Sequence, residues 1–193
     1  PDGAEPAALP DPARPIVLAR RREDCGLARC VAPGLVEVGA MLPYSPLHHL
    51  LLDAFGGPVV ATSGNVSGEP VLTDPDEAEA RLGAVADSFL HHDRPVVRPA
   101  DDSVVRIVAG RARPIRLGRG VAPLELELPR ELPEPVLAVG GHLKLAVALA
   151  WDRRIVVSPH IGEMGTLRSE QVFEQVVADL QRLYDVTARH WLC

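Results

Sequence analysis

The stretch Pro58-Val59-Val60-Ala61-Thr62-Ser63-Gly64-Asn65 decides how this chain is interpreted, because it joins a strand-like run to small polar residues. Residues 58–62 are short, apolar and β-branched, which is typical of a buried strand. In open α/β sheets, ligands bind beyond the carboxyl ends of the strands. We therefore expect a strand over 58–62 and an anion or nucleotide near Ser63 and Asn65. A plain turn is the alternative.

The elements around this stretch predict an alternating α/β pattern. Residues 1–14 contain four prolines and are expected to form a tail or loop. A helix over 45–55 should begin at the N-cap Ser45 and end at Gly56, and a second helix should open at Asp74-Pro75. Strands are expected over 15–19 and 36–42, and over 104–108 and 112–117 as a hairpin.

Composition shifts over residues 121–135, where prolines and glutamates predict an extended acidic linker. Beyond it we expect strands over 136–139, 145–151 and 155–157, with a turn at Asp152-Arg153. A long amphipathic helix should follow over 166–185. The chain is therefore predicted to be an α/β protein with two domains.

Composition and charge narrow the class of protein. The 193 residues are 47% hydrophobic, and the net charge of −6 argues against nonspecific polyanion binding, although arginines cluster over 106–119. No apolar run approaches the roughly 20 residues of a membrane helix, and residues 1–14 lack the regions of a signal peptide. The three cysteines form neither an even set nor a zinc pattern. We expect a cytoplasmic protein with reduced thiols and no membrane partner.

Two further motifs could carry chemistry. Gly140-Gly141-His142-Leu143-Lys144 lies between two predicted strands, where backbone amides and an ammonium group could meet a phosphate. A plain turn with an exposed lysine is the alternative. In Asp101-Asp102-Ser103, the serine could hold a phosphate or ribose and the carboxylates could hold magnesium, or the run could be a polar strand entry. Adjacent helical side chains point apart, so His48 and His49 are not expected to share a metal ion, and no metal site is assigned to His91-His92 either.

Taken in order, these motifs resemble the HypF-like carbamoyltransferases of [NiFe]-hydrogenase maturation. The resemblance to their YrdC-like domain rests on the runs Met41–Leu51, Ala61–Pro70, His92–Pro95, Asp101–Arg106 and Arg119–Pro123. Gly140–Lys144 and His160–Glu163 resemble the opening of the actin-like transferase domain that follows. The implied fold is a partial YrdC-like twisted-sheet domain, followed by the first strands and helix of an actin-like (ASKHA) domain.

The resemblance implies a two-step reaction. Carbamoyl phosphate and ATP form carbamoyl adenylate, and the carbamoyl group then passes to the C-terminal cysteine of a HypE-like acceptor protein, where it becomes the cyanide ligand of the hydrogenase. ATP and Mg²⁺ are the implied cofactors. A metal in the actin-like domain and zinc in upstream fingers are implied only for the full-length protein.

The resemblance also implies two sets of binding residues and identifies no catalytic residue. The nucleotide and carbamoyl-adenylate site would comprise Thr62, Ser63, Asn65, Ser103, Arg106 and Arg119. A second nucleotide site would comprise Gly140, Gly141 and Lys144.

The Lys-x-Arg pair of the YrdC-type signature does not occur in this sequence. We therefore expect a fragment that is inactive alone, with a YrdC-like domain over 15–120 that lacks its N-terminal half, a linker over 121–135, and the start of the actin-like domain over 136–193. Two alternatives stay open. One is a threonylcarbamoyl-adenylate synthase of tRNA modification, and the other is a noncatalytic module that binds nucleotide or double-stranded RNA.

Overall fold

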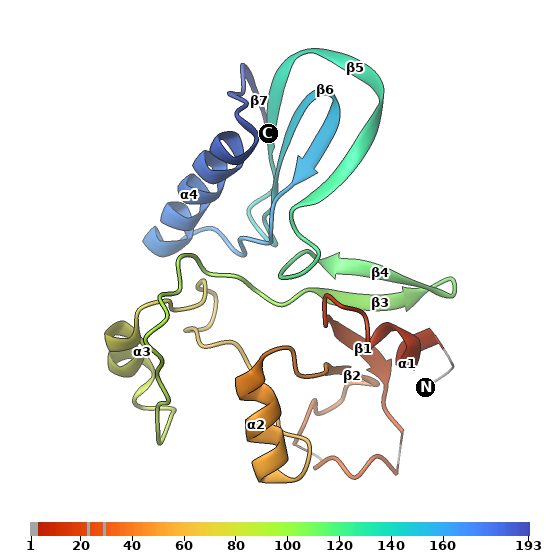
Figure 1. Cartoon of the computed structure of the whole chain (residues 1–193), viewed down its shortest axis with the longest axis vertical. Coiled ribbons are helices and arrows are strands. Elements are labelled where there is room, and N and C mark those ends of the chain that lie inside the picture. The colour runs from red at the N-terminus through yellow and green to blue at the C-terminus, as the bar shows by residue number, and fades with distance from the viewer. Residues whose placement is uncertain (1–3, 23, 29) are drawn as a thin grey trace. The chain divides into compact units, whose positions relative to one another are not determined.

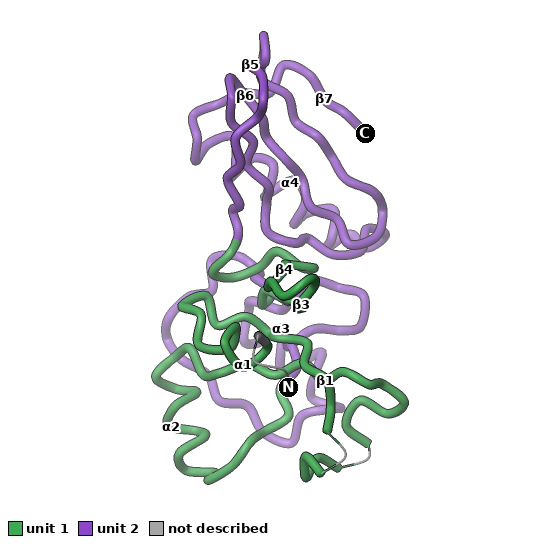
Figure 2. The backbone as a smooth tube through the Cα atoms, turned by 90° about the vertical axis from the view of Figure 1, so that its right-hand side faces the viewer, with its two compact units in different colours: residues 1–61, 102–121 green, residues 62–101, 122–193 purple. Residues whose placement is uncertain are grey.

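The computed structural model describes residues 4–22, 24–28 and 30–193, so residues 1–3 of the expected tail lie outside the described residues. The chain divides into two compact units (Figure 2). Unit 1 comprises residues 1–61 and 102–121, and unit 2 comprises residues 62–101 and 122–193. Each unit combines helices with a sheet of its own.

Unit 1 is built on a four-stranded sheet of order β2-β1-β3-β4 (Figure 1). Its elements are α1 (Ala4–Ala8), β1 (Ile16–Arg20), β2 (Glu37–Ala40), α2 (Pro46–Phe55), β3 (Val104–Val108) and β4 (Arg111–Arg116). β1 runs parallel to β3, and the other two pairs are antiparallel. Four expected strands are thus confirmed, including the hairpin. The expectation of a tail without structure is wrong over Ala4–Ala8, which form a short helix.

The predicted boundaries of α2 are confirmed by its caps. The Ser45 hydroxyl accepts a hydrogen bond from the backbone N–H of His48 at 3.2 Å, and Pro46 occupies the first turn. Gly56 ends the helix with φ 75°, a left-handed conformation that glycine adopts without strain. These signals are local, so they act wherever the helix lies in the fold.

The strand expected over 58–62 is absent from the structure. These residues have no regular secondary structure, and Val59 and Val60 are 53% and 78% exposed. A strand needs a neighbour for its N–H and C=O groups, and none of the described strands pairs with 58–62. The apolar run therefore remains unpaired despite its β-branched composition.

Unit 2 is built on a three-stranded sheet of order β6-β5-β7. Its elements are α3 (Pro75–Leu82), β5 (Leu124–Val139), β6 (Val147–Val157), α4 (Leu167–Tyr184) and β7 (His190–Leu192). β5 and β6 form an antiparallel hairpin around Gly140-Gly141, as expected, and β7 adds parallel to β5. α3 and α4 are confirmed. None of the described helices is long and apolar enough to span a bilayer.

The core of unit 2 lies between α4 and the β5–β6 hairpin. Leu137, Val147 and Leu149 contribute from the strands, while Val177 and Leu180 contribute from the helix. The apolar face of the amphipathic helix expected from the sequence thus contributes to the core, although Leu183 near the end of α4 is 67% exposed.

Two expectations in this half of the chain are wrong. The residues expected as a linker are largely strand, because β5 begins at Leu124. The strand tolerates its prolines because Pro129, Pro133 and Pro135 lie where the β5–β6 register shifts and ladder pairing lapses. The turn expected at Asp152-Arg153 lies inside the continuous strand β6, where Asp152 has φ 48°.

Candidate functional site

The predicted Ser63–Asn65 motif forms a closed loop in unit 2. The Ser63 hydroxyl donates to the Asn65 side-chain oxygen, and Asn65 Nδ2 donates to the carbonyls of Val66 and Glu69, both at 3.0 Å. The Leu72 N–H bonds the Gly64 carbonyl at 2.9 Å. Asn65 therefore fixes the shape of the loop, while Ser63 remains exposed.

Thr62 is exposed beside this loop. Thr62, Ser63 and Asn65 belong to unit 2, whereas Ser103, Arg106 and Arg119 belong to unit 1. Exposure leaves the Thr62 and Ser63 side chains accessible to a polar ligand, and the loop holds its Ser63 oxygen in place through Asn65.

Ser103 in unit 1 is fully buried and bonded within the protein. Its hydroxyl donates to the Arg119 carbonyl at 3.1 Å and accepts from the Gly118 N–H at 2.9 Å. A buried hydroxyl that both donates and accepts has its main hydrogen-bonding capacity filled. The structure thus shows Ser103 connecting the start of β3 to the segment after β4.

Arg119 binds four groups of unit 1 at once. Its guanidinium donates to the carbonyls of Ala13 and Arg14, each at 3.0 Å, and Nε donates to Asp102 Oδ1 at 3.0 Å. The same group lies 3.4 Å from the centre of the Tyr44 ring, a cation–π contact. Three chain segments meet on this one side chain, so its observed contacts are structural.

Arg106 differs from Arg119 because it is exposed and, among the described residues, its ion pair is with Glu37, at 2.7 Å. Of the three site residues expected in unit 1, Ser103 and Arg119 are hydrogen-bonded to each other, whereas Arg106 binds Glu37 instead.

The expected magnesium pair at Asp101-Asp102 does not form. Asp102 pairs with Arg119 in unit 1, whereas Asp101 belongs to unit 2 and its Oδ2 bonds His160 Nδ1 at 2.7 Å. Each carboxylate thus has its own partner. In the described part of the chain, no group of three or more His, Cys, Asp or Glu residues is arranged to hold a metal ion.

The expected phosphate turn after β5 is the connection over residues 140–146 that joins the two strands of the hairpin. A Cβ on Gly140 would lie 2.8 Å from the Ala146 carbonyl oxygen, so this position requires glycine, whereas Gly141 is open. Lys144 adopts φ 57°, and its ammonium group lies 3.2 Å from a Glu163 carboxylate oxygen. The Lys144 side chain is 76% exposed, so it is accessible to a ligand but already paired.

Unit 2 also contains a small pocket that the sequence did not indicate. It has a volume of about 80 Å³, room for two or three water molecules. Most of its lining is apolar, and its polar groups are His160, Asp101, Gln175 and the ion pair of Arg98 with Asp179 (3.2 Å).

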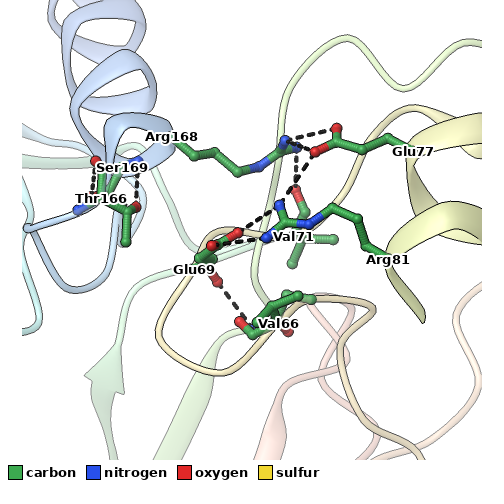
Figure 3. Close-up of polar contacts among 9 residues, drawn as sticks. Val66, Glu69, Val71, Glu77, Arg81, Thr166, Arg168 and Ser169 are labelled. Atoms are coloured by element: carbon green, nitrogen blue, oxygen red, sulfur yellow. Dashed lines mark hydrogen bonds and ion pairs between the residues drawn. The ribbon is translucent and has the colours of Figure 1, made fainter. Parts of the chain in front are cut away.

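A chain of ion pairs in unit 2 was likewise missed from the sequence (Figure 3). Arg168, Glu77, Arg81 and Glu69 alternate in charge and contact one another in that order. The hydrogen bond from Arg81 is the main cause of a lowered pKa of Glu69, and the same bond raises the pKa of Arg81. The spacing of Glu77 and Arg81, four residues apart in a predicted helix, was the available signal.

Two family profiles match the chain. The Sua5/YciO/YrdC profile, described as telomere recombination, matches residues 4–118, and the HypF Kae1-like domain profile matches residues 131–193. The carbamoyltransferase HypF of Synechocystis is 45% identical over 96% of this chain and 24% of its own length. That of Rhodobacter capsulatus is 46% identical over 93% of this chain and 24% of its own length.

Solved structures agree with these matches. Full-length HypF in a phosphate- and nucleotide-bound form has a TM-score of 0.92 at 35% identity, covering 99% of this chain and 30% of that one. The HypF of T. kodakarensis has a TM-score of 0.85 at 37% identity, covering 91% and 23%. The chain spans about a quarter of the length of its curated relatives. It belongs to the Sua5/YciO/YrdC family as a HypF-like member, with a YrdC-like part followed by a Kae1-like, that is actin-like, part.

Proposed function

We propose that this chain serves in a HypF-type carbamoyltransferase that activates carbamoyl phosphate with ATP and transfers the carbamoyl group to a protein thiol. The observation that carries the proposal is the match of both parts of the chain, in order, to HypF proteins. The exposed Ser63 hydroxyl in a loop closed by Asn65 supports a ligand role for that loop. The proposed setting is the cytoplasm.

The proposed chemistry balances as follows. Carbamoyl phosphate, ATP and one water yield carbamoyl adenylate, pyrophosphate and phosphate. The acceptor, a C-terminal cysteine of a HypE-like protein, then attacks the carbamoyl carbon as thiolate and releases AMP. The product is a protein thiocarboxamide, the proposed precursor of the cyanide ligand in [NiFe]-hydrogenases. AMP is a good leaving group, and the reactive adenylate must be kept from water between the two steps.

The residues proposed to bind the nucleotide differ in what they offer. Thr62 and Ser63 offer exposed hydroxyls, and Asn65 orients Ser63. Arg106 offers an exposed cation that is already paired with Glu37. At the proposed second nucleotide site, which comprises Gly140, Gly141 and Lys144, the exposed Lys144 cation is likewise paired, with Glu163. Asp101 and Asp102 do not fit a Mg²⁺ site, so a magnesium ion would arrive on the phosphates of ATP.

The test measures AMP formation from ATP by the complete protein that carries this chain. We expect AMP to form with carbamoyl phosphate and not with threonine plus bicarbonate, the substrates of the alternative tRNA-modification reaction. Ser63→Ala should lower the rate about tenfold, the effect of losing roughly 1.4 kcal/mol of hydrogen bonding. Ser67→Ala is the matched control, an exposed serine four residues away.

Two results would contradict the proposal. One is AMP formation only with threonine and bicarbonate. The other is an equal rate of AMP formation for the Ser63→Ala and Ser67→Ala variants, which would show that the Ser63 hydroxyl does not contact the nucleotide.

A further inference from the structure

We propose that Arg168, in the Kae1-like part, is a positioning residue for the Ser63–Asn65 loop of the YrdC-like part. It acts through the chain of ion pairs with Glu77, Arg81 and Glu69 (Figure 3). All of these residues lie in unit 2. The inference rests on the proposed function only in assigning a nucleotide to the loop.

The position of Arg168 in α4 is the first argument. Thr166 caps this helix, and Arg168 lies in its first turn. A helix N-terminus carries partial positive charge and favours acidic side chains there. An arginine at this place is disfavoured by its own helix, so its stabilising contacts must come from elsewhere in the unit.

Those contacts come from the segment between residues 62 and 101. Arg168 Nη1 lies 2.9 Å from both carboxylate oxygens of Glu77 in α3. Nη2 donates to the carbonyl of Val71 at 3.2 Å. Val71 precedes Leu72, whose N–H closes the loop onto Gly64. The Arg168 side chain is only 21% exposed, so water screens these contacts less than at an open surface.

The chain of contacts continues from Glu77 to the loop itself. Arg81 lies 3.3 Å from Glu77 Oε1 and binds both carboxylate oxygens of Glu69, at 2.9 and 2.7 Å. The backbone carbonyl of Glu69 in turn accepts the hydrogen bond from Asn65. The C-terminal side of the loop is therefore tied to Arg168 twice, directly at Val71 and through the chain of ion pairs at Glu69, and Gly64 and Asn65 are hydrogen-bonded to that side.

Apolar packing offers this segment little alternative support. Among the described residues from 62 to 101, Leu72 is the one buried apolar residue. Polar contacts therefore contribute much of what holds the segment within unit 2, beside the apolar lining that Pro70 and Val71 share with α4. Since Asn65 orients the Ser63 hydroxyl, loosening Glu69 should change how well Ser63 is held.

Hydrogen exchange in the complete protein tests this coupling without any ligand. Arg168→Ala should speed exchange of the Asn65, Glu69 and Leu72 amides about threefold to tenfold, the range for a partly exposed ion-pair network. Exchange within α4 should stay unchanged, which shows that the helix remains folded. Arg153→Ala is the matched control, because Arg153 forms an exposed ion pair with Glu127 at 3.0 Å within unit 2 and this pair does not involve the segment 62–101. Arg168→Lys keeps a cation near Glu77 and should restore part of the protection.

ATP titration of the same variants supplies the second readout. Arg168→Ala should raise the ATP KM about threefold to tenfold with a smaller change in kcat, and the control should change neither. Equal amide exchange in the Arg168 and Arg153 alanine variants would overturn the inference. Failure of the unaltered protein to bind ATP would instead overturn the proposed function. The coupling between Arg168 and the Ser63–Asn65 loop would still be decided by amide exchange, which needs no ligand.

Discussion

Replacing Arg119 by alanine separates its two possible roles in unit 1. The resemblance to HypF-like proteins implies a nucleotide contact, whereas the structure shows that the guanidinium donates to the carbonyls of Ala13 and Arg14 and to the Asp102 carboxylate. A hydrogen bond that involves a charged group contributes about 1.5–3 kcal/mol. The side chain is 27% exposed, so water can reach part of the site once the arginine is removed. We expect unit 1 to lose about 2–4 kcal/mol of stability.

Amide hydrogen exchange measures this loss where it should occur. The Ile16 N–H at the start of β1 bonds the Ser103 carbonyl at 2.8 Å, beside the residues that Arg119 holds. A loss of about 2–4 kcal/mol corresponds to exchange roughly 30-fold to 1000-fold faster. Arg106→Ala is the matched control, because its exposed ion pair should contribute at most about 1 kcal/mol, or about fivefold.

Equal protection of Ile16 in the Arg119 and Arg106 alanine variants would refute the structural role. Unchanged protection combined with lost ATP binding would instead establish Arg119 as a nucleotide contact.

Three further perturbations test other features of the chain. Gly140→Ala should lower the free energy of unfolding by about 2 kcal/mol, because the added Cβ would meet the Ala146 carbonyl oxygen. Gly141→Ala adds its Cβ in open space and should change the free energy of unfolding by less than about 0.5 kcal/mol. The shift of the calorimetric Tm measures both effects. The Arg81 hydrogen bond lowers the pKa of Glu69, so its stabilising effect is present above the carboxyl's unfolded pKa. The difference in unfolding free energy between the unaltered protein and the Glu69→Gln variant should therefore become smaller as the pH falls and the Glu69 carboxyl of the folded protein is protonated. Burial is the main cause of a raised pKa of Tyr184, so the contribution of the neutral phenol to folding stability should be lost as the pH rises above about 10. The ionisation should appear as a step in phenolate absorbance that the Tyr184→Phe variant lacks.

Features with local causes were predictable from the sequence. The caps at Ser45 and Thr166 depend on residues within one helical turn, and both helices begin where expected. The hairpin around Gly140 follows from a diglycine between two apolar runs. In each case, neighbouring residues contain the whole signal.

Features that depend on distant partners were not predictable. The run 58–62 has the composition of a strand but no described strand beside it. The prolines over 121–135 suggested a linker, yet they fall at the register shifts of β5, which only its pairing with β6 reveals. Arg119 bonds carbonyls 105 and 106 residues away, and no local pattern indicates such contacts.

The candidate residues divide by how the fold uses them. In unit 1, Ser103 is buried and all three guanidinium nitrogens of Arg119 donate to protein groups, so a ligand that took over these donors would have to displace stabilising hydrogen bonds. In unit 2, Ser63 is exposed, and its orienting contact is made by Asn65. Binding favours groups that are preorganised and need not break existing contacts. Direct ligand contacts of this chain should therefore come chiefly from the Ser63 loop, with the buried residues of unit 1 shaping the scaffold.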